Sequence, residues 1–415
     1  MIHRLKPAQH EVLRRFRLGQ NVFALLPTGY GKSLCYQWPA LRWGWRVVVV
    51  SPLVALMEDQ VRGLAPSKAL RLHSGMTSRE ECETLERVDR DDWRILFVSP
   101  ERLLDWERKG FWWNRRVPDL LALDEFHCVS EWRGFRPAYR ALGDAVTGMA
   151  ARGACVGAFT ATMPVARAQR IFQDWGLHVG VMDLPLGREN LGTWLAPCEH
   201  EAERWLSLVG LLGRVRGGRG ALVYCSSRAA TEDLARSLTS MGFSVGAFHA
   251  GLPADLRMAR LRGFLGGHIR VMVATSAFGM GLDRSDVDLV VHWGLPWSVE
   301  GLWQEAGRAG RGNQEAHHVV LWCRSDLMRF RNETVQEPGF ELVDLLLRSD
   351  CRKSALTAHF GVGPSECGGC DVCWSGHGRL PEALHPLEKI VGRTAWWLSD
   401  EAAPRDWMGN FLKNS

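Results

Sequence analysis

Short β-branched runs alternate with helical stretches along most of the chain, and this pattern restricts the fold more than any other feature. A first series of expected strands covers residues 21–26, 46–50, 95–98, 120–123 and 156–159. A second series covers residues 221–224, 245–249, 270–274, 289–292 and 318–322. Continuous apolar strands separated by helices are typical of parallel sheets that helices cover on both faces. We therefore predict an α/β chain with two tandem, doubly wound parallel-sheet lobes.

Breaks in this pattern divide the chain into four expected parts. Glycine and proline interrupt both periodicities at residues 184–188, which we interpret as a linker. The first lobe is expected to comprise residues 1–187 and the second residues 188–325. A helical, cysteine-bearing module is expected over residues 326–376, and a short helical tail over residues 377–415.

Composition excludes several classes of protein. Hydrophobic residues make up 46% of the chain and charged residues 23%, as in an ordinary globular protein. The apolar runs are too short to cross a bilayer and the first residues lack the apolar core of a signal peptide, so we expect a cytoplasmic protein with no membrane partner. A net charge of +5 is compatible with a polyanionic partner, but a GC-rich coding sequence would also explain the excess of arginine over lysine.

A phosphate-binding loop is expected after the first strand. Residues 25–33 read Leu-Leu-Pro-Thr-Gly-Tyr-Gly-Lys-Ser, and a predicted helix opens at their end. Backbone N–H groups and the positive end of such a helix attract phosphate. Gly29 and Gly31 let the backbone wrap an anion. Lys32 is suited to the β- and γ-phosphates, and Ser33 is suited to Mg²⁺.

Two adjacent carboxylates end a buried strand of the same lobe. Asp124 and Glu125 follow the apolar run at residues 120–123. Asp124 is suited to hold Mg²⁺ through water, and Glu125 is suited to orient and deprotonate the attacking water in phosphoryl transfer. An acidic N-cap for the next helix is the alternative, and it loses weight because a phosphate-binding loop stands in the same expected sheet.

Two arginines in the second lobe complete the expected nucleotide site. Arg308 and Arg311 stand in a glycine-rich segment at residues 304–312. Guanidinium groups in this pattern act as arginine fingers on a γ-phosphate, which would require both lobes to close on one ATP. Closing and opening with each hydrolysis cycle would make the pair of lobes a motor. A flexible basic turn is the alternative.

Four cysteines have the spacing of a metal site. Cys351, Cys367, Cys370 and Cys373 follow the pattern C-x15-C-x2-C-x2-C. Four thiolates in overlapping Cys-x-x-Cys hooks suit a structural, tetrahedral Zn²⁺ ion that folds a module too small to bury a core. An iron–sulfur cluster is the rival. The other cysteines are expected to be small buried residues outside any disulfide framework.

Taken in order, these elements resemble the RecQ family of DNA helicases within superfamily 2. The similarity runs from Lys6 to Cys373. The segments that support it are residues 5–9, 51–60, 98–103, 127–139, 159–162, 224–228, 248–252, 274–283 and 304–312. The most specific of them is the aromatic-rich segment at residues 127–139. The resemblance implies two RecA-like lobes followed by a zinc-binding module.

The resemblance also implies roles for individual residues. Contacts to ATP are implied for Lys6, Gln9, Thr28, Gly281, Asp283 and Gln304. Contacts to nucleic acid are implied for Ser51, His127, Trp132, Phe135, Arg136, His249 and Thr275. Trp132 and Phe135 offer flat faces for base stacking, worth about 1–3 kcal/mol per base, although core aromatics are the alternative. One departure from the family is Phe126, which replaces a residue that is usually small.

The implied activity is that of an ATP-dependent DNA helicase, which hydrolyses ATP while moving 3′ to 5′ on single-stranded DNA in recombination or repair. Its cofactors would be ATP, Mg²⁺ and structural Zn²⁺, and its partners single-stranded and forked duplex DNA and a single-strand-binding protein. About forty residues follow Cys373, so we expect a short form without the winged-helix and helical DNA-binding domains common in the family. The alternatives are an RNA-directed or duplex-translocating ATPase and a non-catalytic DNA-binding or annealing scaffold.

Overall fold

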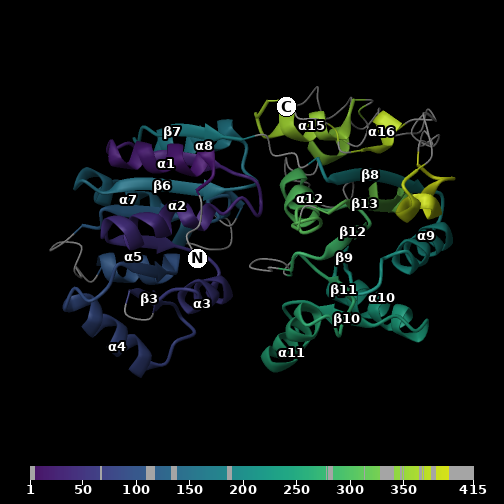
Figure 1. Cartoon of the computed structure of the whole chain (residues 1–415), viewed down its shortest axis with the longest axis horizontal. Helices are drawn as coiled ribbons and strands as arrows, with labels where there is room; N and C mark the ends of the chain where they lie inside the picture. Colours follow the sequence, from purple (N-terminus) through teal and green to yellow (C-terminus); the bar gives the residue numbers. More distant parts are fainter. Residues whose placement is uncertain are drawn as a thin grey trace. The chain divides into compact units, whose positions relative to one another are not determined.

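Two compact units, each built around a parallel sheet, form the computed structural model of this protein (Figure 1). The first unit comprises residues Met1–Leu186 and Thr357–Gly363, and the second comprises Gly187–Leu356 and Pro364–Ser415. The predicted four-part division stays a prediction. The structure describes residues 5–65, 68–108, 117–131, 138–184, 189–276, 278, 284–312, 314–327, 341–345, 348, 350–363, 367, 369–374 and 380–391.

Within these residues the first unit contains a seven-stranded parallel sheet in the order β3-β4-β2-β5-β6-β1-β7. Its strands are β1 (Val22–Leu25), β2 (Val47–Val50), β3 (Ala69–Leu72), β4 (Ile95–Val98), β5 (Leu120–Leu123), β6 (Cys155–Thr160) and β7 (Gly180–Asp183). Its helices are α1 (Pro7–Arg17), α2 (Lys32–Trp38), the π-helix η1 (Pro39–Trp43), α3 (Val54–Arg62), α4 (Ser78–Asp89), α5 (Pro100–Arg108), α6 (Cys128–Glu131), α7 (Ala138–Ala151) and α8 (Val165–Asp174).

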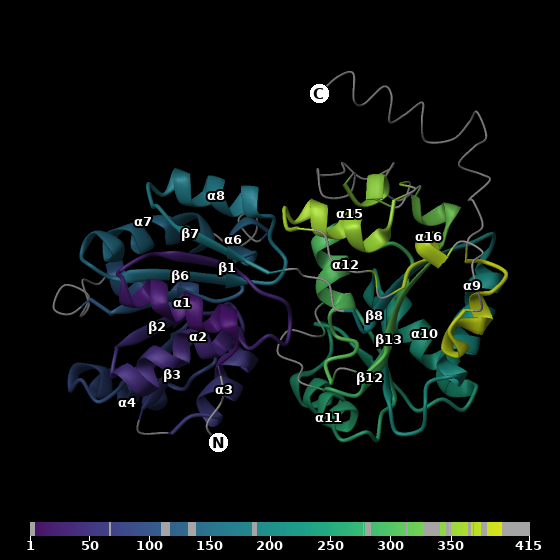
Figure 2. The same cartoon turned by 45° about the horizontal axis from the view of Figure 1, so that its top comes forward.

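Helices cover both faces of this sheet because its central strands are apolar on both sides. Every residue of β1, β2, β4 and β5 is buried. On one face, α1 and α2 pack onto the sheet through Phe16 and Tyr36. On the other face, Phe172 of α8 meets Phe23 of β1, and α7 and α8 lie together on that side in Figure 2.

The described part of the second unit contains a six-stranded parallel sheet in the order β10-β11-β9-β12-β13-β8. Its strands are β8 (Leu191–Cys198), β9 (Gly220–Cys225), β10 (Val245–Phe248), β11 (Val271–Ala274), β12 (Val287–Trp293) and β13 (Ala316–Cys323). Its helices are α9 (Glu201–Gly213), α10 (Arg228–Ser240), α11 (Ala254–Leu265), α12 (Val299–Ala306), α16 (Asp371–Trp374) and the 3-10 helix η3 (Glu382–Leu387). A further helix, α15 (Arg352–His359), begins in this unit, and its residues from Thr357 onward belong to the first.

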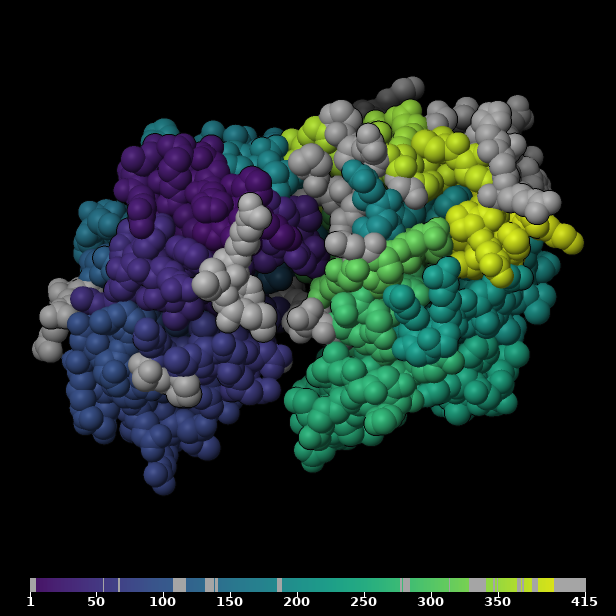
Figure 3. Space-filling model, viewed as in Figure 1, coloured from purple at the N-terminus to yellow at the C-terminus, as the bar shows by residue number. Residues whose placement is uncertain are grey.

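The two faces of the second sheet bury different residues. Helices α9, α10 and η3 share the core on one face, and α11 and the end of α12 share the core on the other. Leu384 and Leu387 of η3 are fully buried against α9. In Figure 3 the yellow segment near the C-terminal end of the described residues lies against the teal surface of the second unit. The described part of the predicted tail therefore belongs to the core of the second lobe.

The structure confirms the predicted α/β class with two parallel-sheet lobes. Within the described residues it adds three strands that the sequence patterns did not predict, namely β3, β7 and β8. Most of the predicted linker lies outside the described residues. In the part of the chain that the structure describes, every helix is too short or too polar to traverse a lipid bilayer.

Candidate active site and metal centre

The predicted phosphate-binding loop lies in the turn between β1 and α2. Gly29 and Gly31 have φ angles of 79° and 90°, a left-handed conformation that disfavours residues with a Cβ. A Cβ at Gly31 would also lie only 2.8 Å from Gln9 Nε2. Helix α2 begins at Lys32, and its first N–H groups therefore face the loop. This arrangement presents backbone donors and a lysine to an anion.

Asp124 lies at the same edge of the sheet, directly after β5. It is 8% exposed, and the Tyr36 hydroxyl donates a hydrogen bond of 3.3 Å to its Oδ2. Burial, and then the charge of Glu125, raise the pKa of Asp124 to about 7, while the charge of Lys32 opposes the shift. A cation beside Asp124 would favour the ionised form, so Asp124 together with Ser33 fits a Mg²⁺ ion.

Glu125 has an unusual backbone conformation. Its φ angle is 48°, and such a conformation costs about 1–3 kcal/mol in a residue other than glycine. His127 Nδ1 lies 3.4 Å from Glu125 Oε2 and 3.0 Å from Thr160 Oγ1. Thr160 ends β6. Contacts through His127 therefore connect Glu125 to Thr160, in one of the segments that support the resemblance to RecQ helicases.

Two residues predicted to contact nucleic acid in this lobe are buried. His127 is 3% exposed and Ser51, directly after β2, is 1% exposed. Their described contacts are with other residues of the protein, which suits side chains that support a nucleic-acid-binding surface from beneath. Trp132, Phe135 and Arg136 lie outside the described residues. The nucleic-acid contacts of all five stay predictions.

Gln9 and Tyr30 connect α1 to the phosphate-binding loop. Gln9 is 1% exposed, and its Nε2 donates to the carbonyl oxygens of Tyr30 and Gly31 at 3.1 and 2.9 Å. Its Oε1 accepts from Lys6 N at 2.8 Å, and Lys6 Nζ lies 4.5 Å from the centre of the Tyr30 ring. No sequence pattern singled out Tyr30. The predicted contact of Gln9 with adenine stays a prediction, and its amide already positions the loop.

Phe126 is a core residue behind the acidic pair. Its ring stacks on that of Phe172, with 5.0 Å between the centroids and 13° between the planes. The rings of Phe23 and Trp175 lie 6.1 and 5.8 Å away. An aromatic cluster therefore accommodates the large side chain that stands where the family usually has a small one.

In the second lobe, Arg308 and Arg311 lie in the turn that follows α12. Gly310 N donates to Val287 O at 2.8 Å, which fixes this turn to the start of β12. Arg308 is 7% exposed. Burial raises the pKa of the Tyr224 hydroxyl, and the Arg308 guanidinium lies close enough for its charge to oppose that larger effect. Arg308 Nε has no hydrogen-bond partner among the described residues. This buried guanidinium therefore retains a donor for an anion.

Other predicted contacts of this lobe lie near the ends of strands and in α12. His249 follows β10 and is 4% exposed, and its Nε2 lies 2.9 Å from Glu232 Oε1. Thr275 follows β11, and Gln304 lies in α12. The predicted ATP contacts outside the described residues are Gly281 and Asp283.

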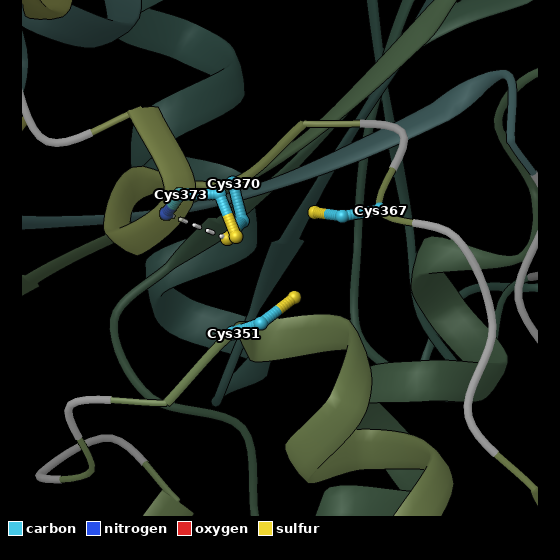
Figure 4. A group of neighbouring side chains, drawn as sticks. All are labelled: Cys351, Cys367, Cys370 and Cys373. Carbon is cyan, nitrogen blue, oxygen red and sulfur yellow. Dashed lines mark hydrogen bonds between the residues drawn. The ribbon is translucent and has the colours of Figure 1, made fainter. Parts of the chain in front are cut away.

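The four C-terminal cysteines converge on one point (Figure 4). Their Sγ atoms all lie within 4.8 Å of one another. Cys351 precedes α15. Cys370 precedes α16 and Cys373 lies within it, where Cys373 N donates to Cys370 Sγ at 3.3 Å. Burial would raise the pKa of Cys351, but hydrogen bonds from the Ser354 backbone and from Cys367 and Cys373 lower it to about 7. Four converging thiols with one readily ionised member fit a tetrahedral Zn²⁺ site.

A buried ion pair fixes this cluster to the edge of the second sheet. Arg352 Nη2 lies 2.8 Å from Asp371 Oδ2, and Leu195 N of β8 donates to Asp371 Oδ1 at 3.2 Å. Thr193 N of the same strand donates to Gly369 O at 2.9 Å. Arg352 and Asp371 were not among the predicted site residues, although an aspartate inside the second Cys-x-x-Cys hook was an available signal. Of the cysteines expected to be buried, Cys82 is exposed, so that expectation was wrong for Cys82.

The known proteins that are similar to this chain are helicases. The DEAD/DEAH box helicase family matches residues 6–171, and the helicase conserved C-terminal domain matches residues 203–313. The ATP-dependent DNA helicase RecQ of Pasteurella multocida (strain Pm70) is 33% identical over 388 residues, which cover 89% of this chain and 60% of that protein. Over most of its length this chain is therefore similar to RecQ-type DNA helicases, of which it spans about three fifths. The RecQ protein of Bacillus subtilis (strain 168) is 32% identical over 375 residues, which cover 85% of this chain and 62% of that relative.

Solved structures show the same architecture. The DUF1998 helicase MrfA, in a complex with DNA and AMPPNP, has a TM-score of 0.65 and 18% identity, and the match covers 88% of this chain and 56% of that one. At this identity the likeness concerns the fold alone. It confirms that the two parallel-sheet lobes of this chain resemble RecA-like helicase folds.

Proposed function

We propose that this chain is an ATP-dependent DNA helicase of the RecQ type. The observation that supports this most is the convergence of the phosphate-binding loop, Lys32 and the Asp124–Glu125 pair at the carboxyl edge of one sheet. Lys32 is close enough to Asp124 to influence its pKa. Phosphoryl transfer needs these groups together. DNA is the proposed substrate because the curated relatives are named DNA helicases.

In the proposed reaction the first lobe binds ATP and activates water. Lys32 and the backbone of residues 29–33 bind the β- and γ-phosphates, and Ser33 and Asp124 would hold Mg²⁺, which neutralises phosphate charge when it is bound. Glu125 orients the attacking water and accepts its proton, so that ADP and phosphate are formed. The buried contact of Glu125 with His127 gives nucleic-acid binding a route to alter this base.

The second lobe supplies positive charge in this proposal. Arg308 and Arg311 act on the γ-phosphate as negative charge develops on it, so residues of both lobes serve the same ATP. The proposed nucleotide contacts also include Lys6, Gln9, Thr28, Gly281, Asp283 and Gln304. The proposed nucleic-acid contacts are Ser51, His127, Trp132, Phe135, Arg136, His249 and Thr275.

Further parts of the proposal concern partners and place. Movement is proposed to run 3′ to 5′ on single-stranded DNA, with forked duplexes as substrates and a single-strand-binding protein as a partner in recombination or repair. The cysteine cluster is proposed to hold structural Zn²⁺. The proposed location is the cytoplasm.

ATP turnover by the purified chain, measured with DNA and RNA strands of equal length, tests the proposal. We expect stimulation by single-stranded DNA, little stimulation by RNA, and loss of turnover in Lys32→Ala. Lys68→Ala, which alters an exposed lysine of the same lobe, is the matched control. Equal stimulation by RNA would favour an RNA-directed motor, and binding of DNA without any turnover would favour a scaffold. Displacement of a strand from 3′-tailed but not 5′-tailed duplexes tests the direction.

A further inference from the structure

A buried polar network lies beneath the turn that carries Arg308. His292 of β12 has its Nε2 2.6 Å from Glu305 Oε2 and its Nδ1 2.8 Å from His318 Nε2. These three residues come from β12, α12 and β13, and their exposed fractions are 2%, 8% and 0% for His292, Glu305 and His318. The proposed chemistry uses none of them.

The network extends to Arg308 in two ways. The rings of Tyr224 and His292 stack, with 5.6 Å between centroids and 25° between planes. The Tyr224 hydroxyl donates to Phe278 O at 3.0 Å, which leaves it free to accept a hydrogen bond from the Arg308 guanidinium. Along the backbone, Arg308 N donates to Glu305 O at 3.1 Å. Both the side chain and the main chain of Arg308 are therefore fixed by residues of the network.

Stability alone does not account for these polar residues. The rest of this face of the sheet is an apolar core that includes Leu222, Val290 and Ala306. Replacing a buried ionic cluster by apolar residues of similar volume is often neutral or stabilising. A hydrogen-bonded polar network, in contrast, favours one geometry because each hydrogen bond has a direction. Here the geometry that is fixed is that of α12 and of the turn after it.

We propose that His292 and Glu305 are positioning residues, which orient Tyr224 and the end of α12 so that the Arg308 guanidinium is held in one orientation for ATP hydrolysis. This inference rests on the proposed function. It predicts a particular kinetic effect. Loss of the network should lower kcat, because Arg308 acts on the transition state, and should change KM for ATP much less.

The residue before His318 in β13 offers a matched control. His317 is 7% exposed, so it is almost as buried as the histidines of the network. It faces the opposite side of the sheet, where its ring lies 6.5 Å from that of Trp194. A substitution at His317 therefore tests what the loss of a buried histidine does without disturbing Arg308.

Steady-state kinetics with saturating single-stranded DNA provides the test. A misplaced catalytic group costs on the order of 10²-fold, so we expect kcat to fall at least about 10-fold in His292→Ala and Glu305→Ala. Glu305→Gln should keep most of the rate, because its amide oxygen still accepts from His292 Nε2–H. His317→Ala should hydrolyse ATP at a rate close to that of the wild type. Should His292→Ala not fold, the comparison of Glu305→Ala with Glu305→Gln decides alone.

A double-mutant cycle with Arg308→Lys separates positioning from general loss of structure. If His292 acts through Arg308, His292→Ala should lower kcat far less in the Arg308→Lys background than in the wild type. An equal fall in both backgrounds, an equal fall in His317→Ala, or an unchanged kcat in the folded His292→Ala and Glu305→Ala variants would overturn the inference. Absence of DNA-stimulated hydrolysis in the wild type would instead overturn the proposed function, and the inference with it.

Discussion

The two lobes share one architecture but hold their candidate catalytic residues in different ways. In the first lobe these groups lie on turns whose shape comes from the backbone, since Gly29, Gly31 and Glu125 all have positive φ angles. In the second lobe the arginine turn also has a left-handed glycine, Gly310 with a φ angle of 66°, but buried side-chain hydrogen bonds centred on His292 and Glu305 lie beneath it. This turn therefore combines backbone conformation with a buried polar network. Substitutions in the second lobe should matter even at residues that never touch a ligand.

One buried group in each lobe makes stability depend on pH, and the two dependences have opposite signs. The raised pKa of Asp124 means that the folded first lobe binds its proton more readily than the unfolded chain, so this group disfavours folding as pH rises toward 7. Burial, and then the charge of His292, lower the pKa of His318 well below its ordinary value of 6.5. The unfolded chain then binds the proton more readily, so His318 disfavours folding as pH falls below 6.5.

Removing the proposed metal should give the largest effect, and this effect should differ between the two lobes. Cys370→Ser should abolish zinc binding and unfold the module that pairs with β8, since zinc binding supplies about 10–16 kcal/mol in small zinc-dependent peptides. The first lobe should still bind nucleotide. Metal analysis and nucleotide titration of one preparation measure both effects, with the exposed Cys82→Ser as control. Less than about half an equivalent of zinc in the wild type would refute the metal assignment.

Glu125→Gln should show that the acidic turn of the first lobe is catalytic. Loss of the general base should lower DNA-stimulated kcat about 10²–10⁴-fold, while ATP still binds. Single-turnover hydrolysis and equilibrium binding of ATP separate the two effects. The control is Glu86→Gln, which alters an exposed glutamate of the same lobe. A turnover rate near that of the wild type would remove Glu125 from the mechanism.

Phe126→Ala should destabilise the first lobe without changing the stability of the second. Truncation of a fully buried phenylalanine costs about 3 kcal/mol or more, and here it would open a cavity beside Phe172. Urea unfolding should therefore show an earlier transition for this lobe. Leu206→Ala, at a position that is 69% exposed, should leave the transitions unchanged. Equal midpoints for the two variants would show that the aromatic cluster does not support the acidic turn.

The smallest expected effect concerns pH. In the wild type, His318 should lower stability by up to about 1.4 kcal/mol per pH unit as pH drops below 6.5, which opposes the contribution of Asp124 over the same range. His318→Gln should flatten this dependence, and His10→Gln, at an exposed histidine, should not. Thermal unfolding between about pH 5 and pH 7, where histidine titrates, measures the slope of stability against pH. Parallel slopes in all three proteins would contradict the burial argument.

The sequence could predict the sheets because buried parallel strands are continuous apolar runs. β2 and β5 show this most clearly, since all their residues are apolar and buried. The missed strands break that pattern. β3 contains Arg71, β7 is an edge strand whose residues are partly exposed or exposed, and β8 contains glycine and proline. Hydrogen bonding to neighbouring strands determines where these three strands lie, and no local sequence pattern encodes that pairing.

The candidate site was predictable only where a residue type and a turn coincide. Lys32, Asp124 and Glu125 directly follow or belong to turns after strands, so spacing alone brings them to one edge. The contacts of Gln9 with Tyr30 and of His292 with Glu305 join segments that lie apart in the sequence, and no motif pairs these residues. Such contacts depend on side-chain packing, which periodicity does not report.

The claim that residues of both lobes serve one ATP is tested most directly by turnover of Lys32→Ala, Arg308→Ala and the double variant on saturating single-stranded DNA. We predict that each single substitution lowers turnover to a similar low rate and that the double variant falls little further, because groups that act as a unit are not additive. A correctly folded Arg308→Ala protein that hydrolyses ATP as fast as the wild type would contradict the claim.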